Sequence, residues 1–123
     1  MVIHESAEDY LETILKLRMK QGNVRSIDVV GELRYSKPSV SVAMKKLRES
    51  GHVRMDENGY LTLTEAGEAI AQRIYERHQV LVQMLTALGV DEEIAAQEAC
   101  KIEHVISDDT FEKIKTHFLE KTR

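Results

Sequence analysis

Apolar residues recur every three or four positions along most of the chain, a pattern typical of amphipathic helices. In the N-terminal part this spacing predicts a helix over residues 5–20 and two shorter helices after it. Ser26 and Ser36 are placed to cap the short helices, because a serine oxygen can accept a hydrogen bond from the free N–H groups of a first turn. Pro38 fits the first turn of the third helix, where a missing N–H costs nothing.

The helical spacing stops after the third predicted helix. Residues 53–55 and 60–63 read as two short strands, and they flank Asn58-Gly59, the strongest short-range signal for a tight turn between strands. Two short helices joined by a tight turn and followed by such a hairpin make a winged helix-turn-helix. The sequence therefore predicts a mainly α fold that contains this unit.

The second half of the chain returns to helical spacing and predicts three more helices. They are expected from Thr64 to about Leu88, from Asp91 to about Ser107, and from about Asp109 to about Lys121. Gly89 closes the first of them, since glycine readily adopts the left-handed conformation that ends a helix. We find no internal repeat or low-complexity segment.

Charge is distributed unevenly, although the net charge is only −4. Nine basic and three acidic residues lie between Arg18 and Arg54, whereas the remaining residues carry eight basic and eighteen acidic side chains. A basic segment attached to an acidic body suggests one part that faces phosphates and another that binds cations. With one cysteine, no apolar run of membrane-spanning length and no signal-peptide pattern, we expect a cytoplasmic protein without a membrane partner.

The outer face of the third predicted helix is rich in serine and lysine, which can contact base edges and phosphates in the DNA major groove. Arg54 and the predicted hairpin, which forms the wing, are placed to contact the adjacent DNA backbone. The alternative is a basic helix that is only solvated. The residues predicted to bind DNA are Arg25, Ser36, Lys37, Pro38, Ser39, Ser41, Val42, Lys45, Lys46 and Arg54.

Three side chains that can bind a metal lie at positions i, i+3 and i+4 near the C-terminus. A helix through Cys100, Glu103 and His104 would direct a thiol, a carboxylate and an imidazole to one point. From spacing alone, the alternative is a solvated acidic face with a half-buried cysteine. Further candidate ligands are Asp9, Glu12 and His78, whereas surface positions are expected for His4, His52 and His117.

Five segments together resemble one known family. They are Glu-Asp-Tyr-Leu-Glu-Thr-Ile at 8–14, Ser-Lys-Pro-Ser-Val-Ser at 36–41, Leu-Thr-Leu-Thr-Glu-Ala-Gly at 61–67, Glu-Arg-His-Gln-Val-Leu at 76–81, and Glu-Ala-Cys-Lys-Ile-Glu-His-Val-Ile-Ser-Asp at 98–108. The chain resembles the diphtheria toxin repressor and manganese transport regulator family, in its short two-domain branch. This resemblance implies a homodimeric, metal-activated repressor of metal homeostasis that binds a palindromic operator in double-stranded DNA. It implies a winged helix-turn-helix domain at 1–70 and a helical metal-binding and dimerisation domain at 71–123.

The resemblance also implies the ligands and the kind of metal. The matching ligand positions are Asp9, Glu12, His78, Cys100, Glu103 and His104. Aspartate at position 9 is typical of the manganese branch, whereas cysteine at position 100 is typical of the iron branch, so Mn²⁺ and Fe²⁺ both stay open, with one or two ions per protomer. Val82 and Ala96 occupy positions where the iron branch has ligands of an ancillary site, and we expect that site to be absent.

Two other functions compete with this interpretation. A metal-independent winged-helix regulator would keep the basic helix but has no reason to gather six potential ligands. A small metallohydrolase could use the same donor types, but the sequence has no His-Glu-x-x-His motif, and an enzyme would not need a wing. We therefore do not expect an enzyme.

Overall fold

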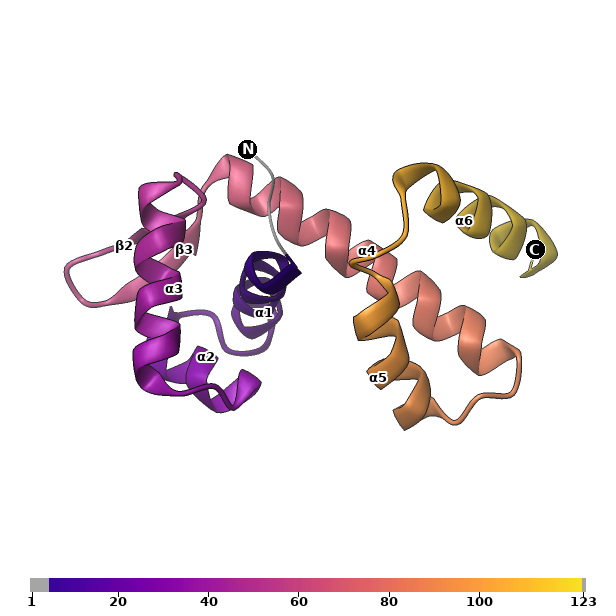
Figure 1. Ribbon diagram of the computed structural model, residues 1–123, viewed down its shortest axis with the longest axis horizontal. Coiled ribbons are helices and arrows are strands. Elements are labelled where there is room, and N and C mark those ends of the chain that lie inside the picture. The colour runs from indigo at the N-terminus through magenta and orange to yellow at the C-terminus, as the bar shows by residue number, and fades with distance from the viewer. Residues whose placement is uncertain (1–4, 123) are drawn as a thin grey trace. The chain divides into compact units, whose positions relative to one another are not determined.

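The computed structural model describes residues 5–122, and its contacts divide the chain into two compact units, residues 1–73 and 74–123. The described part contains six helices and a small sheet (Figure 1). In chain order these are α1 (Glu5–Gln21), β1 (Val24–Arg25), α2 (Ser26–Leu33), α3 (Lys37–Glu49), β2 (Val53–Met55), β3 (Tyr60–Leu63), α4 (Glu65–Ala87), α5 (Glu92–Ile102) and α6 (Asp108–Thr122). The predicted mainly helical fold with one hairpin is confirmed.

The sheet of the first unit has three antiparallel strands in the order β1-β3-β2. The hairpin of β2 and β3 was predicted, and it lies beside α3 (Figure 1). The short strand β1 was not predicted, because two residues carry no periodic signal and the strand exists only through its pairing with β3.

The core of the first unit is formed by side chains from the helices and from all three strands. They are Leu11, Ile14, Leu15, Val24, Val29, Val40, Met44, Leu47, Val53 and Leu61.

Helix α3 begins as predicted. The Ser36 hydroxyl accepts a hydrogen bond from the Ser39 N–H at 3.2 Å, and Pro38 occupies the first turn. The predicted cap of α2 is wrong, because Ser26 is already inside the helix. Instead, the Asp28 carboxylate accepts a hydrogen bond from the Arg25 N–H at 2.9 Å, so the cap forms one residue earlier.

The turn between α2 and α3 contains a strained residue. Arg34 follows the last residue of α2 and has φ 59° and ψ 31°, in the left-handed region that side chains other than glycine rarely adopt. Its N–H donates to the Val30 carbonyl at 2.8 Å, which ends the helix and turns the chain toward α3.

The corner between α3 and β2 is packed tightly against the first turn of α4. The Thr64 N–H donates to the carbonyl of His52 at 3.1 Å, and the Gly67 N–H donates to the Thr64 hydroxyl at 3.1 Å. His52 was predicted at the surface, but it is buried in this corner, with its Nδ1 2.7 Å from the Ser50 hydroxyl. A β-carbon at Gly67 would lie 2.0 Å from the His52 carbonyl oxygen, so only glycine fits there.

The second unit contains the C-terminal part of α4 together with α5 and α6. Its buried residues include Ile74, Leu81, Ala95, Ala99 and Phe111. Helix α5 ends earlier than the predicted limit near Ser107. The reason is that the Ser107 hydroxyl accepts a hydrogen bond from the Thr110 N–H at 3.1 Å and so caps α6, which leaves residues 103–106 as a turn.

Within residues 5–122, none of the helices combines the length and the apolar character needed to cross a membrane. His4 lies outside the described residues.

Candidate metal centre and DNA-binding surface

Glu103 and His78 form a close pair inside the second unit. The Glu103 side chain is fully buried, and its Oε1 lies 3.0 Å from Nδ1 of His78, a half-buried residue of α4. If two donor atoms each lie about 2.1 Å from one ion, and the angle between them at the ion is about 90°, the two donor atoms are about 3.0 Å apart. The spacing of this pair therefore fits two ligands of a common cation.

The second carboxylate oxygen of Glu103 supports the same interpretation. Oε2 is buried, and within the part of the chain that the structure describes it has no hydrogen-bond partner. A buried polar atom left in this state costs on the order of 1–3 kcal/mol, and more when it carries charge. A divalent cation bound to this oxygen would remove that cost, so the residues of this unit fit a metal.

Two further predicted ligands lie next to Glu103 in the chain. Cys100 is in the last turn of α5, and His104 belongs to the turn that follows, and both are half-buried. Glu103 keeps helical backbone angles, with φ −58° and ψ −24°, although it lies just beyond the helix. The i to i+3 relation between Cys100 and Glu103 is thus preserved. His104 lies in a turn, although the sequence predicted a helix there.

The other two predicted ligands belong to α1 in the first unit. Asp9 is half-buried, Glu12 is 3% exposed, and they are separated by three positions on the helix. Lys16 lies one turn further along, with its Nζ 3.4 Å from Oε2 of Glu12. A cationic group therefore already occupies a position next to this carboxylate.

Sequence reasoning missed Arg77, a charged residue that is only 3% exposed. Its guanidinium donates to the carbonyl oxygens of Glu103 and Ile106, and it forms an ion pair with Asp108. A signal was present in the sequence. Arg77 lies on the same helical stripe as Ile74 and Leu81, and an arginine at a core position needs buried partners.

The residues predicted to bind DNA all lie at the surface of the first unit. Val42 on α3 is 53% exposed, although it is apolar. Arg25 lies over the ring of Tyr60, with its guanidinium carbon 4.6 Å from the ring centre, and Arg54 projects from β2 as an exposed side chain. The remaining predicted contacts are exposed along α3 and its cap: Ser36, Lys37, Pro38, Ser39, Ser41, Lys45 and Lys46.

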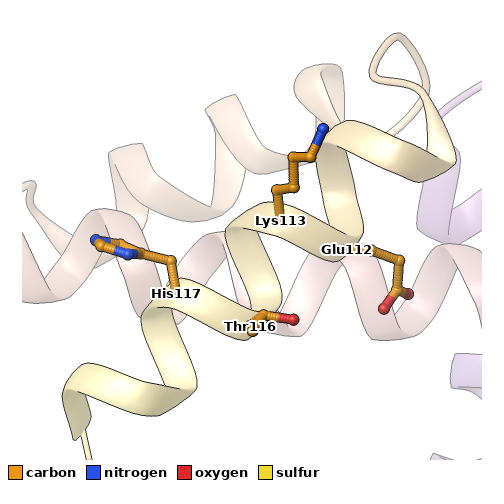
Figure 2. A pocket seen from close by; sticks show the side chains of 4 residues that line it. All are labelled: Glu112, Lys113, Thr116 and His117. Atoms are coloured by element: carbon orange, nitrogen blue, oxygen red, sulfur yellow. The ribbon is translucent and has the colours of Figure 1, made fainter.

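A shallow pocket on α6 contains none of the predicted ligands. Figure 2 shows its four side chains projecting from one helix in different directions, not toward a common point. They are Glu112, Lys113, Thr116 and His117, and all four are exposed. A set of this kind offers no converging donors, and the pocket is not a candidate site.

Two protein-family models match the chain. Residues 3–67 match the family model "Iron dependent repressor, N-terminal DNA binding domain", and residues 64–121 match "Iron dependent repressor, metal binding and dimerisation domain". The chain belongs to the iron-dependent repressor family. The two descriptions associate DNA binding with the N-terminal half of this repressor-family chain, and metal binding and dimerisation with the C-terminal half.

Relatives of this repressor-family chain are transcriptional regulators. The transcriptional regulator MntR of Salmonella typhimurium is 36% identical over 108 residues, which cover 88% of this chain and 69% of that protein. An uncharacterised HTH-type transcriptional regulator of Methanocaldococcus jannaschii is 36% identical over 120 residues, covering 95% and 94%. A solved manganese-dependent transcriptional repressor in complex with manganese matches with a TM-score of 0.83 at 29% identity, covering 90% of this chain. The chain spans about half the length of such solved regulators.

Proposed function

We propose that this protein is a metal-activated transcriptional repressor that controls metal homeostasis and binds its operator when a divalent cation is bound. The observation that carries the proposal is the Glu103 carboxylate, which is fully buried, lies 3.0 Å from His78 and has a buried oxygen that no described group satisfies. Protein folds rarely keep such a group unless it has a function.

The proposed metal site uses six ligands. Asp9 and Glu12 come from the first unit, and the second unit supplies His78, Cys100, Glu103 and His104. Support comes from the donor types, from the family match and from the His78–Glu103 geometry. When bound, the ion would supply positive charge that offsets the negative charge of the carboxylate ligands. Because the proposed ligand set draws on both units, we propose that metal binding couples DNA binding to the helical unit.

The activating ion is proposed to be Mn²⁺ or Fe²⁺, with one or two ions per protomer. Carboxylate and imidazole donors suit Mn²⁺, whereas the Cys100 thiolate favours a softer ion such as Fe²⁺. The related repressor solved with manganese favours the first of these ions.

The DNA partner is proposed to be a palindromic operator that a homodimer binds. We place the DNA-binding domain in residues 1–70 and the metal-binding and dimerisation domain in residues 71–123. Leu88, Ile94 and Val105 expose apolar side chains on the second unit, which suits an interface with a second copy. A symmetric dimer presents two α3 helices to two half-sites. A repressor must be in the same compartment as its operator, and we propose that this compartment is the cytoplasm.

Metal activation requires a moderate free energy. To change a mostly inactive dimer into a mostly active one, metal must favour the active form by roughly 3–5 kcal/mol. One or two divalent ions with several protein ligands can supply this amount. The chain's own residues then bind DNA, with lysines of α3 at phosphates and the small side chains of α3 at base edges.

The test is operator binding measured during titration with Mn²⁺, Fe²⁺ or Zn²⁺ under anaerobic conditions, compared with binding in excess chelator. We expect binding to require metal, and His78→Ala to abolish the response while the dimer stays folded. His117→Ala removes an exposed histidine of α6 and is the matched control, for which a normal response is expected. Equal operator binding with metal and with chelator would favour a metal-independent regulator. Hydrolysis of a substrate without operator binding would instead favour a metallohydrolase.

A further inference from the structure

The buried position of Arg77 needs an explanation, because a guanidinium is costly to remove from water. Arg77 lies on the inner face of α4 between Ile74 and Leu81, two residues with no exposed surface. A buried cation is retained only where opposite charge and hydrogen-bond acceptors compensate for lost hydration. The partners of Arg77 therefore indicate what the residue does.

Within the described residues, the hydrogen bonds and the ion pair of Arg77 all go to the connection between α5 and α6 and to Asp108, the first residue of α6. Nη1 donates to the Glu103 carbonyl at 3.1 Å and to the Ile106 carbonyl at 2.7 Å, and Nη2 pairs with the Asp108 carboxylate. The guanidinium carbon also lies 5.4 Å from the centre of the Phe111 ring. One side chain thus binds both ends of the turn that contains His104.

Glu103 is consequently held at two points by neighbouring residues of α4. Arg77 binds its backbone carbonyl, and His78 contacts its carboxylate. We propose that Arg77 is a positioning residue, which fixes the 103–106 turn so that Glu103 and His104 are already arranged for metal binding. This inference rests on the proposed metal-activated function. Groups that orient metal ligands in this way typically change metal affinity by 10–100-fold when they are removed.

A purely structural role makes a different prediction. If Arg77 only stabilised the packing of α4 against α5 and α6, its loss would lower the stability of the fold, but the folded protein would bind metal normally. If Arg77 positions the turn, metal binding to the folded variant must also order the turn, and the free-energy cost of that ordering lowers the metal affinity. Metal affinity measured on folded protein distinguishes the two roles.

The experiment measures Mn²⁺ binding by calorimetry on the full chain, after circular dichroism has established folding, for R77M, R77K and K115M. Lys115 is the matched control, because it joins α6 to α4 through Glu76 at 3.1 Å and, within residues 5–122, makes no hydrogen bond to the turn. We expect R77M to weaken Mn²⁺ binding at least tenfold. R77K should recover part of this loss, since an ammonium can still reach a carbonyl, and K115M should bind as the wild type does.

A second readout uses Co²⁺ as the probe, because its visible absorption reports the ligand geometry. R77M should broaden or shift the Co²⁺ bands of the wild type, and K115M should leave them unchanged. If R77M does not fold, D108N is measured in its place, because it keeps the arginine and removes only the charged anchor. For D108N we expect a loss of at least threefold in Mn²⁺ affinity.

The outcomes separate the two proposals. Wild-type Mn²⁺ affinity in folded R77M, or in D108N where R77M is unfolded, would overturn the role of Arg77 and leave the proposed function intact. A wild-type protein that binds no Mn²⁺, Fe²⁺ or Co²⁺ would overturn the proposed function itself.

Discussion

At the scale of single residues, Lys16 has a consequence for metal affinity. Its ammonium lies 3.4 Å from the Glu12 carboxylate, which we propose as a ligand, so the lysine and a metal ion compete for one group. Because the lysine side chain is 37% exposed, solvent weakens the pair, and such pairs contribute about 0–1 kcal/mol. We expect Lys16→Met to raise Mn²⁺ affinity by up to about fivefold.

Calorimetric titration of the full chain checks this expectation. Lys20→Met removes an exposed lysine of the same helix and is the control for the change in net charge. If both variants gain affinity equally, the effect comes from overall charge and not from competition at Glu12.

At the scale of elements, the close contact between α4 and the α3–β2 corner determines what position 67 tolerates. An alanine normally stabilises a helix relative to glycine by about 0.5–1 kcal/mol. At Gly67 the added β-carbon would meet the His52 carbonyl at 2.0 Å, and a backbone atom cannot move without shifting the corner. We therefore expect Gly67→Ala to lower the free energy of unfolding by about 1–3 kcal/mol.

Urea unfolding measures this change. Gly31→Ala in α2 is the matched control, because no atom lies within 4 Å of the added carbon, and it should stabilise the protein slightly. A Gly67→Ala variant as stable as Gly31→Ala would contradict the described packing of the corner.

The elements also show which parts of the fold could be predicted from the sequence. Ser36 and the Asn58-Gly59 turn act on their own neighbours, so α3 and the hairpin were predicted to within a residue or two. Strand β1 exists through its pairing with the distant β3 and was missed, and the end of α5 was misplaced because the cap that Ser107 forms for α6 was not recognised. A turn or cap that acts on its own neighbours can be predicted from the sequence, whereas pairing between distant segments cannot.

The candidate site follows the same rule. Spacing and resemblance selected residues with the right donor chemistry, and the ligand set stays a prediction. The contact between His78 and Glu103 joins positions 25 residues apart, and the bond from Arg77 to the Glu103 carbonyl joins positions 26 apart. Neither contact could be predicted without the packing of α4 against the end of α5.

At the scale of the whole molecule, the uneven charge predicts how DNA binding responds to salt. Lysines of α3 belong to the basic segment, and each phosphate contact releases about one counterion. We expect Lys46→Ala to weaken binding to all sequences and to reduce the salt slope by roughly one unit. Val42→Ala should instead cost about 1–3 kcal/mol at particular base pairs, where a valine can contact a thymine methyl.

Affinity measured against salt concentration and against operators with single-base changes separates these two effects. Lys101→Ala, on the exposed face of α5, is the control for a lysine in the acidic half. Equal salt slopes for Lys46→Ala, Lys101→Ala and the wild type would mean that α3 does not face the phosphates.

The left-handed backbone of Arg34 has a final consequence. Glycine would adopt φ 59° without strain, whereas an arginine there costs the fold about 1 kcal/mol. In return, the turn before α3 carries an exposed positive side chain next to the surface proposed to bind DNA. A glycine at this position would make the domain more stable and less attractive to a polyanion. If α3 binds DNA as proposed, the positive charge at this turn therefore comes at a cost in folding stability.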